Sequence, residues 1–277
     1  MIEVLDIGDR VGTGRYRLHS RFRGAIAFIG HRSGRLVSVV DETKSAGPVN
    51  IVVRGLDFDR TRLLAVESRK IYLDSTAIPF RRRSDSCLRP LHFEPARLHR
   101  NLVTLRETLL ASAPTRAIVF LLNDGPDAAR ESSAFESQLT QRLHAGAEQL
   151  LAGDLAGAAA MRGLGHGLTP SGDDFLAGYL LGLYAFEKAG CACFARRRQA
   201  IGAIAVSRNP FSAALLSCAA EGRSIEPARS LIRALFEDSE AGVVRETRRL
   251  AAVGASSGAD LATGLYFALK AWKEPAA

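Results

Sequence analysis

Residues 163–186 read GLGHGLTPSGDDFLAGYLLGLYAF, a polar, glycine-rich stretch that runs directly into an apolar one. Thr169 or Ser171 suits the residue before a helix, proline is favoured in a first helical turn, and carboxylates are stabilised near a helix N-terminus. Apolar residues fill the positions that follow. The stretch predicts a turn and then a helix over residues 173–189, and it marks the second part of the chain as helical.

A shorter copy of the same pattern occurs near the end of the chain. SGADLATG at residues 257–264 repeats the serine, the first glycine, an aspartate and the last glycine of SGDDFLAG at residues 171–178. Glycines in two facing helices permit a close approach. The pattern suggests an internal two-fold repeat that brings Asp174 and Asp260 together, and a separation beyond about two helix diameters would contradict it.

The two parts of the chain have different patterns. Short β-rich pieces separated by turn signals occupy residues 25–73, and their regular spacing favours antiparallel pairing. We therefore predict an α+β fold, in which an N-terminal antiparallel β barrel or sandwich precedes an α-helical domain. Residues 1–125 are expected to form the β-rich domain with a mixed linker segment, and residues 126–277 the helical domain.

The linker segment is expected to contain a helix over residues 98–111 and a buried strand over residues 117–122. The predicted helices beyond it are residues 133–152, a run before Gly163, and residues 173–189, 195–206, 211–221, 226–237, 241–253 and 258–272.

Composition excludes some classes of function. The net charge is +8, but the arginine runs at residues 81–83 and 196–198 have no interleaved aromatics, so we expect no nucleic-acid partner. The four cysteines show no paired ligand spacing. The longest apolar run is too short for a bilayer, and the first residues lack a signal sequence, which predicts a cytoplasmic protein without a membrane partner. The positive charge suits a small anionic substrate.

The turn before the first motif is a candidate anion site. Glycine-rich turns and helix N-termini expose N–H groups that bind phosphate or carboxylate, yet two adjacent aspartates would repel a bare anion. Two arrangements remain open: Mg²⁺ held by Asp173, Asp174 and Asp260, or carboxylates that accept N–H groups of an amide substrate.

The candidate residues fall into two groups. The catalytic candidates are Asp174, Asp173 and Asp260. The substrate-binding candidates are Gly165, His166, Gly167, Thr169, Ser171, Gly172, Asn209, Ser212, Ser257 and Gly258.

Each group also has a purely structural interpretation. The aspartates and Ser171 are typical of a capping box, and Asn209 with the proline after it is typical of a helix cap. A single histidine in a glycine turn, such as His166, more often faces solvent than acts in catalysis.

GLGHGLTPSGDDFLAGYLLGL resembles a bacterial family that includes the AllH-type subunit of oxamate carbamoyltransferase. GASSGAD at residues 254–260 looks like the second signature of that family, and the β-rich start with Gly47-Pro48-Val49-Asn50 and the helical tail also fit. The resemblance implies a multi-subunit enzyme of allantoin and purine breakdown. That enzyme exchanges a carbamoyl group between oxalurate and phosphate, giving oxamate and carbamoyl phosphate.

The chain departs from the family pattern at two positions. Family members often carry proline at the position of His166 and histidine at the position of Ala255. The first difference argues against an essential catalytic role for His166, and the second indicates an altered site. Two other functions stay open beside a carbamoyltransferase subunit: a ligand-binding or assembly subunit without chemistry of its own, and a Mg²⁺-dependent phosphoryl-transfer enzyme or hydrolase.

Overall fold

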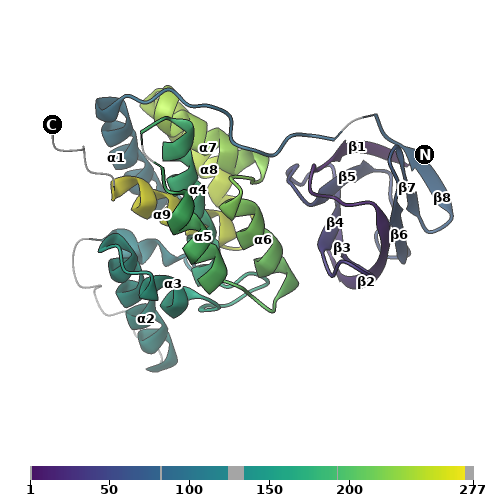
Figure 1. The fold of residues 1–277 in the computed structure, drawn as a ribbon, viewed down its shortest axis with the longest axis horizontal. Coiled ribbons are helices and arrows are strands. Elements are labelled where there is room, and N and C mark those ends of the chain that lie inside the picture. The colour runs from purple at the N-terminus through teal and green to yellow at the C-terminus, as the bar shows by residue number, and fades with distance from the viewer. Residues whose placement is uncertain (1, 82, 124–133, 192, 272–277) are drawn as a thin grey trace. The chain divides into compact units, whose positions relative to one another are not determined.

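Alternating apolar residues near the N-terminus form a single eight-stranded sheet (Figure 1). The computed structural model describes residues 2–81, 83–123, 134–191 and 193–271. It divides into one unit of Met1–Cys87 with Arg223–Glu226, and a second unit of Leu88–Gly222 with Pro227–Ala277. The helix start predicted at Ser133, the helix end predicted at Trp272 and the predicted domain boundary at 125/126 lie outside the described residues.

The sheet of the first unit has the order β1-β5-β4-β3-β2-β6-β7-β8. An isolated bridge between Gly8 and Ser84 joins its two ends, so that the sheet is a nearly closed barrel. The strands are β1 (Glu3–Ile7), β2 (Gly14–Phe22), β3 (Ala25–Gly30), β4 (Leu36–Asp41), β5 (Asn50–Arg54), β6 (Leu63–Val66), β7 (Lys70–Leu73) and β8 (Thr76–Pro79).

The predicted barrel is confirmed, with one correction to its pairing. Six of the ladders are antiparallel, but β4 pairs with β5 in parallel. The connection at residues 42–49 returns the chain to the starting end of β4 before β5 begins, as a parallel neighbour requires. Asn50 donates its side-chain N–H to the Ser45 carbonyl at 2.9 Å and so stabilises this connection. The sheet is therefore mixed.

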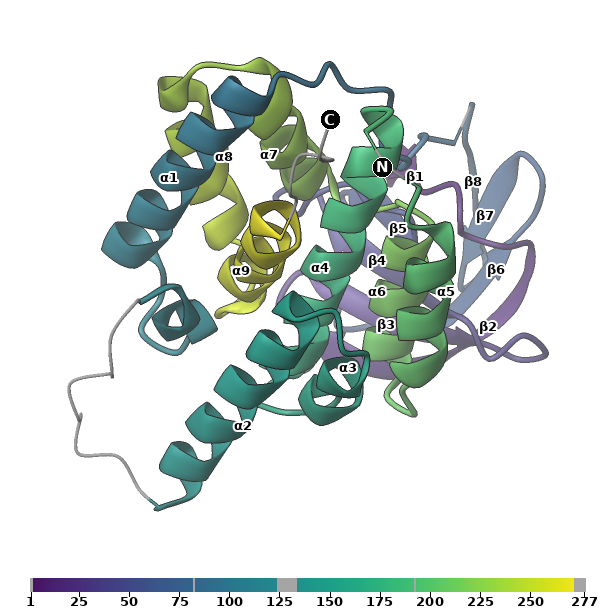
Figure 2. The same cartoon turned by 60° about the vertical axis from the view of Figure 1, so that its left-hand side comes forward.

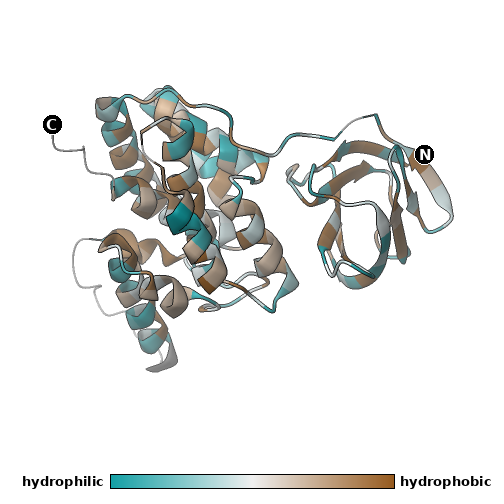
Figure 3. Cartoon of the chain, in the orientation of Figure 1, coloured by the Kyte–Doolittle hydropathy of each residue, from teal (hydrophilic) through white to brown (hydrophobic). Residues whose placement is uncertain are grey.

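The barrel interior is filled by apolar side chains. Ile26, Phe28, Val39 and Ile51 are fully buried and belong to one apolar cluster. The strands are coloured mainly toward the hydrophobic end of the scale in Figure 3, and the loops carry more of the hydrophilic colour.

The second unit is helical. Its elements are α1 (Pro95–Ser112), η1 (Ile118–Leu122), α2 (Ala134–Leu151), α3 (Ala156–Met161), α4 (Ser171–Lys188), α5 (Ala195–Ile204), α6 (Pro210–Ala220), α7 (Glu226–Glu237), α8 (Glu240–Ala251) and α9 (Ser257–Lys270). No helix among the described residues is both long and apolar enough to cross a membrane.

The strand predicted over residues 117–122 is wrong, because this segment forms the short 3₁₀ helix η1. Ile118, Leu121 and Leu122 are buried and the two residues between them are partly exposed, a helical spacing and not the alternation of a strand. The N–H of Ile118 donates to the carboxylate of Asp260 at 2.8 Å, so that a distant aspartate caps η1.

Helices α4 and α9 form the centre of the second unit (Figure 2). A Cβ added to Gly178 in α4 would lie 1.9 Å from the Leu261 carbonyl oxygen, and a Cβ added to Gly264 in α9 would lie 1.9 Å from the Phe175 carbonyl oxygen. The two contacts are reciprocal, since the glycine of each helix meets the backbone of the other. Glycine at both positions permits this backbone-to-backbone packing.

Candidate functional site

The turn before α4 depends on its glycines. Gly163, Gly165 and Gly167 have φ angles of 70°, 110° and 105°, a region that L side chains rarely adopt. A Cβ on Gly165 would also lie 2.7 Å from the backbone nitrogen of Ser171. The turn therefore folds back closely against the first residue of α4.

The second residue of α4 and of α9 is a glycine that donates its N–H to the preceding turn. Gly172 donates its N–H to Leu164 at 2.8 Å, and Gly258 donates its N–H to Val253 at 3.1 Å. A Cβ on either glycine would meet a carbonyl oxygen at 2.0 Å or less. Both glycines have a packing role, and their N–H groups are already used within the chain. Their predicted contact with a substrate stays a prediction.

Asp173 faces the turn. Its Oδ1 accepts the Gly163 N–H at 2.8 Å, and the side chain is fully buried. Its Oδ2 has no hydrogen-bond partner among the described residues. Asp173 thus stabilises the positive-φ turn at Gly163 instead of pointing toward the second motif.

Asp174 faces the second motif. Its Oδ2 accepts the hydroxyl of Thr169 at 3.0 Å, and the Thr169 oxygen lies 3.2 Å from Ser257 Oγ at the start of α9. Burial raises the pKa of Asp174 to about 8. The hydroxyls of Ser257 and Thr169 lower this pKa, and the charges of Asp260 and Asp173 raise it.

Asp260 occupies the matching place in α9 but has different partners. Its Oδ1 accepts the Ile118 N–H at 2.8 Å and its Oδ2 accepts the Ser256 hydroxyl at 2.9 Å. Ser171 of α4 is a further hydrogen-bonding neighbour. Burial raises the pKa of Asp260 to about 6, and these hydrogen bonds hold it lower than it would otherwise be.

The serine of each motif lies near the aspartate of the other motif. Ser257 of α9 lies close enough to lower the pKa of Asp174 of α4, and Ser171 of α4 does the same for Asp260 of α9. The structure therefore brings together five of the predicted residues: Thr169, Ser171, Asp174, Ser257 and Asp260. The two helix starts meet across this set of hydroxyl and carboxyl groups.

The three aspartates of the predicted magnesium site accept hydrogen bonds from within the chain. Among the residues that the structure describes, no group of three His, Cys, Asp or Glu side chains is placed to hold a metal ion. Asp173 accepts a hydrogen bond from the N–H of Gly163 in the turn. Asp174 accepts one from the Thr169 hydroxyl, and Asp260 accepts one from the Ile118 N–H. The geometry gives no support to the magnesium site suggested by the sequence.

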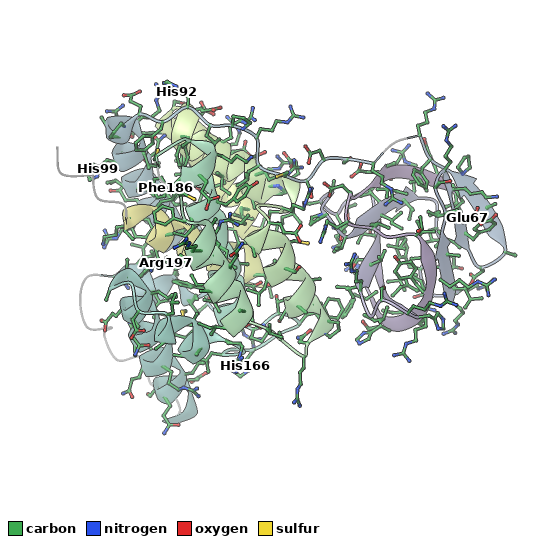
Figure 4. The ribbon with its side chains drawn as sticks, viewed as in Figure 1. Glu67, His92, His99, His166, Phe186 and Arg197 are labelled. Atoms are coloured by element: carbon green, nitrogen blue, oxygen red, sulfur yellow. The ribbon has the colours of Figure 1, made fainter. Side chains whose placement is uncertain are left out.

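The remaining predicted residues lie around this centre. His166 is exposed, and Figure 4 shows it at the edge of the helical unit. Asn209 accepts the Phe211 N–H at 2.9 Å as the cap of α6, and donates to the Leu168 carbonyl at 2.7 Å, which ties the glycine turn to α6. Ser212 is fully buried, and its hydroxyl has no partner among the described residues.

Two contributors to this centre are absent from the predicted set. Ser256 stands beside Ser257 in the second motif, so its hydroxyl was visible as a candidate. Ile118 contributes only its backbone N–H from a distant segment, and its side-chain type gives no signal for that role.

The hydroxyl groups of this centre are more exposed to solvent than its carboxyl groups. Asp174 and Asp260 have relative exposures of 2% and 0%, whereas Thr169, Ser256 and Ser257 are partly exposed. Any ligand that reaches this place from solvent would meet the hydroxyls of Thr169 and Ser257 before the carboxyl group of Asp174.

Residues 161–269 match the family model described as oxamate carbamoyltransferase subunit AllH. The matched region contains α4, α9 and both motifs, and it leaves the barrel strands outside. Searches of curated proteins and of solved structures gave no match. The resemblance predicted from the sequence is confirmed over this segment, which is similar to the AllH subunit family.

Proposed function

We propose that this chain is a subunit of an oxamate carbamoyltransferase-like enzyme, which transfers a carbamoyl group between oxalurate and phosphate in allantoin and purine breakdown. The observation that carries the proposal is the meeting of two helix starts at Thr169, Asp174 and Ser257, inside the region that matches the AllH family. Other protein subunits complete the enzyme, and a small anionic amide or phosphate is the substrate.

The partly exposed hydroxyls would contact the substrate. A carbamoyl group offers N–H donors and a carbonyl acceptor, and a hydroxyl both donates and accepts. In the transfer, hydrogen bonds to the reacting group orient it and stabilise the charge that develops on its oxygen. Thr169 and Ser257 would supply such bonds, and buried Asp174 would fix their direction.

The proposal is tested on the assembled enzyme. The chain is purified with its partner subunits, and phosphate release from carbamoyl phosphate is measured with and without oxamate. Ser257→Ala and Thr169→Val are expected to lower the oxamate-dependent rate by roughly 10²-fold or more, the order of effect of losing an aligned hydrogen bond in a transition state. Ser217→Ala, which removes an exposed hydroxyl from α6, is the matched control and should leave the rate unchanged.

One observation favours a second function, a non-catalytic ligand-binding or assembly subunit. The aspartates and motif glycines are bonded within the chain, as expected of a rigid framework. Under this alternative the same variants would leave the rate of the complex intact and weaken its assembly, measured by its sedimentation. An oxamate-dependent rate that is unchanged in both variants would reject the catalytic proposal.

A further inference from the structure

The side-chain amide of Asn209 makes a hydrogen bond at each of its two ends. Its Oδ1 accepts the Phe211 N–H at 2.9 Å, and its Nδ2 donates to the Leu168 carbonyl at 2.7 Å. A backbone N–H can only donate, so the amide oxygen must face Phe211 and the amide nitrogen must face Leu168. The first bond caps α6, and the second reaches the glycine-rich turn before α4.

Capping alone does not require asparagine at position 209. Serine, threonine and aspartate are also favoured N-cap residues, because each has a side-chain oxygen that accepts the same N–H. Aspartate offers no donor when ionised, and the hydroxyls of serine and threonine are bonded to Cβ, one bond short of the position that Nδ2 reaches. The bond to Leu168 is therefore the contribution of the asparagine amide.

Few other contacts hold the turn at this point. His166, Gly167 and Leu168 are exposed, and Gly167 has a φ of 105°. Among the described residues, no hydrogen bond to another backbone group is made by the backbone of Gly165, Gly167, Leu168 or Thr169. Glycine has more conformational freedom to lose than any other residue. The bond from Asn209 thus restrains the turn where no backbone bond does.

The restrained carbonyl belongs to the same peptide unit as the start of Thr169. A peptide unit is planar, and it contains the carbonyl of one residue together with the nitrogen and Cα of the next. Holding the Leu168 oxygen therefore also places the Thr169 Cα. Pro170 restricts the Thr169 backbone to extended conformations, and a β-branched side chain has few rotamers. The position of the Thr169 hydroxyl between α4 and α9 thus depends on the bond from Asn209.

We propose that Asn209 is a positioning residue of the carbamoyl transfer, which holds the Leu168–Thr169 peptide so that the Thr169 hydroxyl meets the substrate. This inference rests on the proposed function, in which Thr169 contacts the reacting group. Asn209 begins α6, which packs against α4 in the same unit, so the turn is tied to a second helix. A displacement of about 1 Å in such a site can lower a rate by about 10²-fold.

Backbone dynamics of the full chain test the restraint without any need for activity. Asn209→Ser keeps an N-cap oxygen and adds no charge, but it removes the donor to Leu168. By NMR relaxation, the order parameters of the Leu168 and Thr169 amides should be about 0.85 in the unmodified chain and below about 0.6 in the variant. The Ala213 amide, which donates to the Asn209 carbonyl at 2.9 Å, should keep its value. Unchanged order parameters at Leu168 and Thr169 overturn the inference.

Kinetics of the assembled enzyme test the role in the transfer. Asn209→Ser should lower kcat by about 10²-fold. Asn209→Asp, which keeps both the cap and the shape of the side chain, should do the same, because a carboxylate oxygen then faces the Leu168 carbonyl. Ser217→Ala, which changes an exposed residue of the same helix, should keep the rate. An unchanged kcat in both Asn209 variants overturns the inference.

A double variant separates positioning from a general loss of structure. If Asn209 acts through Thr169, adding Asn209→Ser to Thr169→Val should change kcat by no more than about twofold, whereas independent effects multiply. Effects that multiply overturn the inference. A complex without transferase activity overturns the proposed function and with it the role in the transfer, while the order parameters still decide whether Asn209 holds the turn.

Discussion

At the scale of single residues, Asp174 and Asp260 show that equal positions in two motifs can have unequal surroundings. Both are buried and each begins a central helix, yet Asp174 is surrounded by hydroxyls that can rotate and Asp260 by a fixed backbone donor. A hydroxyl can donate or accept a hydrogen bond, so it suits a neighbouring carboxyl group in either protonation state. A backbone N–H can only donate. Burial raises the pKa of both aspartates, the neighbouring carboxylates raise that of Asp174 further, and the Ile118 N–H lowers that of Asp260.

The raised pKa values predict how stability depends on pH. Each aspartate binds its proton more tightly in the folded chain than in the unfolded one, so its contribution is complete below about pH 4 and is lost as the pH rises through its folded pKa. For Asp260 this loss ends near pH 6, and for Asp174 it continues to about pH 8. Between pH 6 and pH 8 the free energy of unfolding should therefore fall.

Urea unfolding at pH 6, 7 and 8 measures this slope. Asp174→Asn removes the titrating group and should flatten the slope between pH 6 and pH 8, whereas Asp59→Asn should keep it. An equal slope in the unmodified chain and in Asp174→Asn would contradict the assignment to Asp174.

At the scale of elements, the closeness of α4 and α9 depends on Gly178 and Gly264. An added methyl group at either position would overlap a backbone carbonyl oxygen. Gly178→Ala and Gly264→Ala are each expected to destabilise the fold by about 1–3 kcal/mol or more, because the helices must separate. Denaturant unfolding measures the change.

Gly202 in α5 gives a matched control. A Cβ there would have its nearest neighbour, the Ala220 Cβ, at 3.7 Å, which is an ordinary contact. Gly202→Ala should stabilise the chain by about 0.5–1 kcal/mol, because alanine suits a helix interior better than glycine. Loss of stability in all three variants would mean that the close approach of α4 and α9 is not the cause.

Much of the element pattern was predictable from local sequence. The apolar spacing and end signals predicted the helices of the second unit and placed most of their ends within a few residues of the observed ones. The strands β1, β2 and β8 were not predicted, because β2 alternates polar residues along GRYRLHSRF and β1 and β8 are short. Their pairing comes from the barrel as a whole.

The candidate site was predictable in part for the same reason. Two similar motifs indicated that Asp174 and Asp260 belong to one place, and the structure joins the two helix starts through Thr169 and Ser257. The orientation of Asp173 toward Gly163 depends on the folding of the glycine turn, and the N–H from Ile118 comes from a distant segment. Neither contact has a signature in local sequence.

At the scale of the whole molecule, the first unit is completed by a segment from late in the chain. Residues 223–226 lie between α6 and α7 in sequence but belong to the barrel unit. Arg223 forms an ion pair with Asp9, and the N–H groups of Ser224 and Glu226 donate to Ser86 and Ala46 at 3.1 Å. The barrel therefore acquires its final contacts only after most of the helical residues have been made.

This arrangement predicts a pattern of hydrogen exchange. Arg223→Met should weaken the protection of the Ser224 and Glu226 amides, since the ion pair that holds the segment is lost. The amides of α4, such as that of Tyr179, should keep their protection. Exchange followed by mass spectrometry or NMR measures both, and equal loss of protection in α4 would show that the segment does not belong to the barrel alone.

The reciprocal glycine contacts also have a consequence for genetics. Each added methyl group would meet main-chain atoms, which are the same whatever residue is encoded at the opposite position. A second substitution at Leu261 or Phe175 therefore cannot relieve Gly178→Ala or Gly264→Ala. A suppressor screen that starts from either variant should return mainly true revertants and changes that stabilise the fold elsewhere, with no paired exchange across the two helices.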